Sequence, residues 1–114
     1  MTVEEYRRIA LAQPEAIESS HMDHPDFRVG GKIFATIPYL AKDEGMVKLT
    51  PDQQKQFAQE YPKIFSAVAG GWGVRGATLV KLTPATRQIV NRAMRTAWRN
   101  TAPKRLIAQV DAEC

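Results

Sequence analysis

The side chains with the greatest capacity for metal chemistry lie in one short segment of this sequence. His21, Asp23 and His24 place two imidazoles and a carboxylate within four residues. Such groups bind zinc and other transition metals. No third histidine and no cysteine lies near them in the sequence to complete a site. We therefore expect a polar turn, in which one side chain hydrogen-bonds the loop backbone, and no metal centre.

Nucleophilic catalysis has little support in the sequence. Ser20 and His21 are adjacent, and adjacent residues of a strand point to opposite faces of a sheet, so these side chains would not meet. No Gly-x-Ser-x-Gly elbow is present. The single cysteine, Cys114, is the last residue, and we expect an exposed terminal thiol there. We predict no catalytic residues, and an enzyme that uses His21 or His24 is the least supported hypothesis.

A glycine-rich segment spans residues 71–76 and reads Gly-Trp-Gly-Val-Arg-Gly, a literal GxGxxG. The dinucleotide fingerprint needs this loop after a strand and before a helix, because the helix amides bind the pyrophosphate. Here the loop precedes a predicted strand, and no Gly-Lys-Ser/Thr is present for a P-loop. We expect a tight turn whose glycines let Trp72 pack over the end of the sheet, and no cofactor.

Positive charge is concentrated on a predicted helix at residues 84–101. Arg92, Arg95 and Arg99 project within roughly 60° of one another at 100° per residue, opposite an apolar stripe. This helix contains no Asp or Glu, so its arginines have no partner one turn away. The pattern fits two interpretations: a solvated basic face that aids solubility, or a surface that contacts nucleic-acid phosphates.

A second cationic feature lies at the start of the predicted last helix, 104–110. The helix dipole disfavours Lys104 and Arg105 there, whereas free amides and two cations together suit an anion. The alternative is pairing with carboxylates such as Asp111 or Glu113. Other cations in the hairpin and the glycine loop extend this surface. The predicted nucleic-acid or anion-binding residues are Arg92, Arg95, Arg99, Lys104, Arg105, Arg28, Lys32 and Arg75.

The bulk composition agrees with an anionic partner. The 114 residues carry a net charge of +4, and 25% are charged. Residues 1–66 hold eight Lys and Arg against ten Asp and Glu, a net charge of −2, whereas residues 67–114 hold eight against two, a net charge of +6. The length suits a single domain, 1–114. A lone cysteine, a charged N-terminus and the lack of a long apolar run predict a cytoplasmic chain without a membrane segment.

The elements that must position these residues follow from caps, turns and periodicity. Thr2 with Glu5 and Thr50 with Gln53 have the spacing of capping boxes, and Thr83 before Pro84 starts the arginine-bearing helix. Gly30-Gly31 suits a two-residue hairpin turn in which Phe27 faces Phe34. The predicted strands are 16–21, 26–29, 32–39, 46–49 and 77–82, and 62–76 is a connection. The order α-β-β-β-β-α-β-α-α predicts an α+β fold, an antiparallel β-sheet packed by helices.

Distinctive segments lie along nearly the whole chain: 21–36, 46–51, Gln53-Gln54, Gly71-Trp72-Gly73, Gly76-Ala77-Thr78, Ala97-Trp98 and 102–106. Together they resemble the MmcQ/YjbR family. The resemblance implies a CyaY-like (frataxin-like) sandwich and predicted DNA binding through a "double wing" of hairpins. The wings here are the Gly30-Gly31 hairpin and the turn at Asp43-Glu44. The resemblance implies no established enzymatic activity. Frataxin's iron chemistry is not expected either, since the first helix has no dense carboxylate run.

Two functions therefore remain open at the level of sequence. The first is a nucleic-acid-binding module with weak, shape-led and salt-sensitive binding, because few base-reading features are visible. The second is a non-enzymatic protein-interaction or small-ligand module that uses the sheet face and the Gly/Trp loop, because the central hairpin is apolar on both faces. DNA is the expected partner of the first, and a monomer is favoured.

Overall fold

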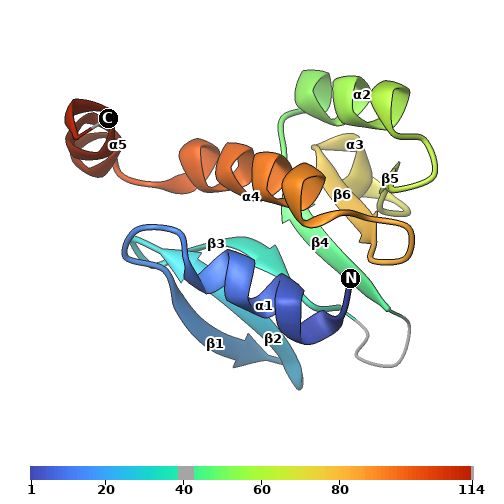
Figure 1. The fold of residues 1–114 in the computed structure, drawn as a ribbon, viewed down its shortest axis with the longest axis horizontal. Helices are drawn as coiled ribbons and strands as arrows, with labels where there is room; N and C mark the ends of the chain where they lie inside the picture. The colour runs from blue at the N-terminus through green and yellow to red at the C-terminus, as the bar shows by residue number, and fades with distance from the viewer. Residues whose placement is uncertain (39–42, 114) are drawn as a thin grey trace.

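Strands from both halves of the chain join in one antiparallel sheet in the computed structural model, which describes residues 1–38 and 43–113 (Figure 1). The strand order is β1-β2-β3-β4-β6-β5. The strands of the described residues are β1 Ile17–His21, β2 His24–Val29, β3 Lys32–Thr36, β4 Glu44–Lys48, β5 Phe65–Ala67 and β6 Ala77–Lys81. The helices there are α1 Val3–Leu11, α2 Pro51–Glu60, α3 Gly71–Val74, α4 Arg87–Thr101 and α5 Lys104–Ala112.

The predicted α+β class and the order of its main elements are confirmed, with two additions in the region predicted as a connection. Strand β5 is three residues long and lies at the sheet edge, too short for an alternating pattern to reveal it. Helix α3 is a single turn between glycines. The predicted strand 32–39 extends to Tyr39, which lies outside the described residues, as does Cys114. Of the turn predicted at Asp43-Glu44, Asp43 lies in a turn and Glu44 already begins β4.

Two of the three predicted threonine caps are confirmed by hydrogen bonds, and the predicted start of the last helix at Lys104 is also confirmed. Thr2 and Thr50 each form a complete capping box, α1 with Glu5 and α2 with Gln53. The predicted start of α4 at Thr83 is wrong, since Thr86 caps the helix and its Oγ1 accepts from the Ile89 amide at 3.3 Å.

The error at α4 arose because two threonines three residues apart both satisfy the capping pattern. The proline after Thr83 favoured the earlier one. In the structure the hydroxyl of Thr83 donates to Oδ2 of Asp43 at 2.7 Å, so Thr83 joins the end of the sheet to the turn before β4.

The central hairpin has the predicted two-residue turn but a different register. Gly30 and Gly31 have φ of 58° and 79°, which glycine adopts without cost, and Val29 pairs with Lys32 as predicted. A β-bulge then shifts the pairing, so Phe27 faces Ala35. The predicted facing pair of Phe27 with Phe34 is therefore wrong. Because the bulge turns two consecutive residues inward, both Phe34 and Ala35 are fully buried.

The hydrophobic core lies on one face of the sheet, beneath α1 and α4, which Figure 1 shows side by side across the strands. The predicted apolar stripe of α4 is confirmed, since Val90, Ala93, Met94, Ala97 and Trp98 are all fully buried. Helix α2 joins this face through Gln53, whose side-chain amide contacts Asn100 of α4 at 2.7 and 3.3 Å.

The opposite face of the sheet keeps apolar residues partly open. Ile33, Met46 and Leu79 project there, and each is only partly buried. In the part of the chain that the structure describes, no helix has the length and apolar character to cross a membrane.

Candidate functional site

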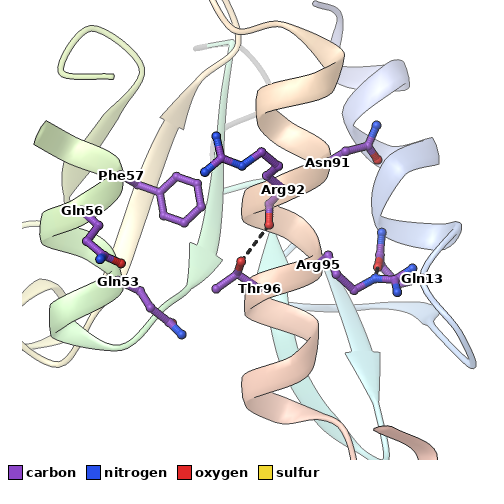
Figure 2. A pocket seen from close by; sticks show the side chains of 8 residues that line it. All are labelled: Gln13, Gln53, Gln56, Phe57, Asn91, Arg92, Arg95 and Thr96. Atoms are coloured by element: carbon purple, nitrogen blue, oxygen red, sulfur yellow. Dashed lines mark hydrogen bonds between the residues drawn. The ribbon is translucent and has the colours of Figure 1, made fainter. Parts of the chain in front are cut away.

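The outer face of α4 forms a broad open hollow of about 660 Å³ with α2 on one side and the end of α1 on the other. Figure 2 shows Arg92 pointing toward Phe57 of α2 and Arg95 pointing the other way, toward Gln13. None of the residues that line the hollow is acidic, and half of them carry amide groups. They are Gln13, Gln53, Gln56, Phe57, Asn91, Arg92, Arg95 and Thr96.

The Arg92 side chain lies toward α2 and contacts three residues there. Its guanidinium lies 5.6 Å from the centre of the Phe57 ring, and its Nη1 donates to the hydroxyl of Tyr61 at 3.1 Å. Glu60 lies 3.7 Å away at the rim. Both members of that ion pair are 53% exposed, so solvent screens it strongly.

Arg95 is held in place by side chains at the other edge of α4. Its Nε–H donates to Oε1 of Gln13 at 2.6 Å, and its guanidinium lies 5.3 Å from the Trp98 ring. Gln13 is buried and is itself fixed by a bond from its Nε2 to the Ile9 carbonyl at 3.1 Å. These contacts orient the Arg95 side chain, which lines the hollow.

The predicted arginines Arg99 and Arg105, which do not line the hollow, also have carboxylate partners. Arg99 donates to both oxygens of Asp111 in α5 at 2.8 and 3.2 Å, and these bonds lower the pKa of Asp111. Arg105 lies 3.7 Å from Glu15, which follows α1. The expected alternative of carboxylate pairing therefore holds for Arg105, although its partner is Glu15 and not Asp111 or Glu113.

The hairpin tip meets the start of α5. The Pro103 ring lies against Gly30, which brings exposed Lys32 to the same end of the molecule as exposed Lys104. Pro103 is the N-cap of α5, and no side chain caps its first turn. Lys32, with Arg28 and Lys48, lines a separate hollow of about 470 Å³. The eight predicted residues therefore do not line one common hollow.

Arg28 and His21 both bind Asp26 on the open face of the sheet. Arg28 donates from Nε and Nη2 at 2.8 and 3.0 Å, and His21 Nδ1 lies 2.9 Å from Oδ2. Arg28 chiefly lowers the pKa of the Asp26 carboxyl, burial opposes the shift, and His21 adds to it. The hydrogen bonds to Asp26 in turn raise the pKa of Arg28. Within residues 1–38 and 43–113, no group of three metal-binding side chains occurs.

The glycine-rich segment carries Trp72 and Arg75 to the open face of the sheet. Trp72 is 62% exposed, and the Arg75 guanidinium lies 5.2 Å from its ring centre. Trp72 lines an apolar groove of about 410 Å³. A turn was expected in 71–76, and most of it is instead the single helical turn α3.

The amide side chains around the arginines were missed by sequence reasoning. Asn91 precedes Arg92, and Gln53 and Gln56 lie on α2, far away in sequence. Arginine periodicity identified α4 but carried no information about which face of α2 lies beside it. That relation is visible in contacts between distant residues, such as those of Gln53 with Asn100 and of Phe57 with Arg92.

The described residues form an α+β fold with a six-stranded antiparallel sheet, α1 and α4 over one face and a polar, basic hollow outside α4. The YjbR family model matches residues 11–100, and the chain belongs to the YjbR family, as its motifs predicted. The match ends before α5, so it covers neither Lys104 nor Arg105.

One solved structure supports the same fold. The crystal structure of Deinococcus radiodurans protein DR2400, with the domain DUF419, is similar to this chain with a TM-score of 0.69 and 17% identity. The similarity covers 85% of this chain and 75% of that one. No curated protein matches the chain.

Proposed function

We propose that the protein binds nucleic acid through the outer face of α4, with Arg92 and Arg95 on the phosphate backbone. The observation that carries this proposal is the open hollow in Figure 2, where the two arginines lie among four amide side chains with no lining carboxylate. Guanidinium groups bind phosphate oxygens through paired N–H donors. Amides both donate and accept, so they suit phosphate, sugar and base edges.

The shape of the surface favours a polymer over a small molecule. The two arginines point to opposite sides of α4, and the hollow is broad and open (Figure 2). Phe57 is buried, and its ring is occupied by Arg92, so it offers no stacking platform for a base. Binding is therefore led by the backbone, with little sequence preference and a strong dependence on salt.

The test is a fluorescence anisotropy titration of labelled duplex DNA over a series of salt concentrations. The double variant Arg92→Gln, Arg95→Gln should weaken binding at least tenfold at low salt. It should also reduce the slope of log affinity against log salt by about 2, roughly one for each phosphate that the variant can no longer neutralise. Single-stranded DNA and duplex RNA of the same length identify the preferred form.

The matched control is Lys81→Gln, Arg87→Gln, which removes the same charge from two exposed residues outside the hollow. It should leave the salt slope close to that of the wild type. Equal losses in the two double variants would mean that overall charge alone drives binding. That result, or no binding at low salt, would refute the proposal.

A further inference from the structure

The face of the sheet opposite α1 and α4 carries a groove that the nucleic-acid proposal does not use. Its volume is about 410 Å³, within the range of small-molecule sites. Its floor is a row across three strands, since Thr36 pairs with Met46 and Met46 with Leu79. Trp72 stands at one side. The lining residues are His21, His24, Ile33, Thr36, Pro38, Met46, Lys48, Val68, Ala69, Trp72, Ala77 and Leu79.

Among the described residues, Leu11 and Ile17 are exposed elsewhere, but the three most exposed large apolar side chains lie in segments that contribute to this groove. Trp72 is 62% exposed although its indole is among the largest apolar groups in the chain. Met22, in the turn between His21 and His24, is 85% exposed, and Val74 of α3 is 78% exposed. Gathered apolar exposure on a small domain marks a binding surface more often than scattered single residues do.

One end of the groove is basic. Lys48 and Ile33 line both the groove and the neighbouring hollow of about 470 Å³, where Arg28 and Lys32 also lie. Neither set of lining residues contains Asp or Glu. The nearby carboxylate of Asp26 is fully covered and bonded to Arg28 and His21, so it does not oppose an incoming anion.

We propose that this groove binds a medium-chain fatty acid, with its acyl chain along Ile33, Leu79 and Trp72 and its carboxylate at Lys48. An unbranched chain matches the aliphatic floor formed by Met46 and Leu79. A single anionic head matches the one ammonium that the groove and the basic hollow share. Nucleic acid fits this face poorly, because the groove offers few polar partners for phosphates.

The experiment uses the emission of Trp72 in the whole protein. Trp98 is fully buried and serves as an internal reference, whereas exposed Trp72 should shift to the blue when a chain covers it. Probes are decanoate, octanoate, decanol and decyltrimethylammonium, each kept below its micelle-forming concentration. Each buried CH₂ contributes about fourfold in affinity, so decanoate, with two more CH₂ groups, should bind roughly fifteenfold tighter than octanoate. Decyltrimethylammonium should bind least.

Calorimetric titration of paired variants tests the head contact. Lys48→Gln should weaken decanoate at least fivefold and leave decanol unchanged. Lys55→Gln, an exposed lysine on α2 outside both hollows, should change neither. The double variant Arg92→Gln, Arg95→Gln should bind decanoate as the wild type does, so this proposal and the nucleic-acid proposal fail separately.

Three results would overturn the fatty-acid site. The first is equal binding of decanoate and octanoate, which would mean that the chain is not in the groove. The second is an equal effect of Lys48→Gln and Lys55→Gln. The third is a dimer by size-exclusion chromatography in which acrylamide fails to quench Trp72, since a second copy would then cover this face.

Discussion

On β2, Arg28 forms two hydrogen bonds with Asp26, which lies two residues earlier in the strand. The Arg28 Nε and Nη2 groups donate to the two carboxylate oxygens at 2.8 and 3.0 Å. Residues two apart on a strand share a face, which places this pair on the open side of the sheet. His21 of β1 closes the cluster from the neighbouring strand. The carboxylate is fully covered, so its charge depends on these partners.

The Asp26 cluster predicts acid sensitivity. Because the pKa of Asp26 is lower when folded than its ordinary value of 3.8, the charged carboxylate stabilises the fold above about pH 4. This stabilisation is lost as pH falls through the lowered pKa. Asp26→Asn should cost roughly 1.5–3 kcal/mol at pH 7, the range for hydrogen bonds to charged groups, and less at pH 2. Urea unfolding across pH 2–7 measures it.

Asp23→Asn is the control for Asp26→Asn, because Asp23 lies in the adjacent turn and is exposed. Its φ is 65°, a conformation that asparagine also tolerates. It should change the unfolding free energy by less than about 0.5 kcal/mol at every pH. Parallel pH profiles for wild type and Asp26→Asn would contradict a role for Asp26 in acid sensitivity.

A second prediction concerns the contact between α1 and β4. Tyr6 is fully buried, and its hydroxyl donates to the Met46 carbonyl at 2.9 Å. Burial raises the pKa of this phenol, so it stays protonated as a donor. The ring lies directly on Gly45, where a Cβ would collide with it. Gly45→Ala should destabilise the fold by about 1–3 kcal/mol through overpacking, measured by urea unfolding.

Tyr6→Phe separates packing from hydrogen bonding at this contact. It keeps the ring and removes the hydroxyl, so it should cost about 1 kcal/mol. The double variant Tyr6→Leu, Gly45→Ala should recover part of the Gly45→Ala loss, because the smaller side chain leaves room for the added methyl group. Strict additivity of the two changes would show that Tyr6 does not cause the loss.

A third prediction tests the observed start of α4. Thr86→Ala removes the N-cap bond to the Ile89 amide and should cost about 1 kcal/mol. Thr83→Ala removes only an exposed bond to Asp43 and should cost less than half as much. Thermal unfolding of the two variants compares the positions directly. A larger loss for Thr83→Ala would favour the start that the sequence pattern indicated.

The contrast between these threonines shows how far local sequence signals reach. The boxes at Thr2 and Thr50 are complete within four residues, so sequence alone predicted them correctly. Choosing between Thr83 and Thr86 needs the position of Asp43, which is distant in the chain. The bulge that pairs Phe27 with Ala35 likewise depends on packing under α4. Local sequence does not decide it, because the hairpin buries apolar residues with or without the bulge.

In the candidate sites too, some features follow from the local sequence and others depend on residues far away in the chain. Periodicity identified Arg92, Arg95 and Arg99 as one face, since a helix fixes their relative directions. Their partners come from other elements, and so Asp111 pairs with Arg99 while Gln13 and Glu60 contact the other two. The sequence therefore predicted where positive charge lies but not which of it is neutralised.

The last prediction follows from the ion pair at the rim of the α4 hollow. Glu60 lies 3.7 Å from Arg92, and both side chains are more than half exposed. Glu60→Gln should change the unfolding free energy by less than about 0.5 kcal/mol, because exposed ion pairs contribute little. It should nevertheless tighten duplex DNA binding about two- to fivefold at low salt, since it removes a negative charge beside the phosphate contact that we propose for Arg92. Anisotropy titration measures it.

Glu113→Gln gives the same change in net charge at an exposed position after α5, outside the hollow. When both variants are titrated at physiological salt, Glu113→Gln should tighten DNA binding by less than half as much as Glu60→Gln, because screening there limits the reach of a charge to about 8 Å. The advantage of Glu60→Gln should also vanish when Arg92 is already Gln. If it persists in that background, Glu60 acts on the overall field of the protein and not through Arg92, and the phosphate contact would have to be assigned elsewhere.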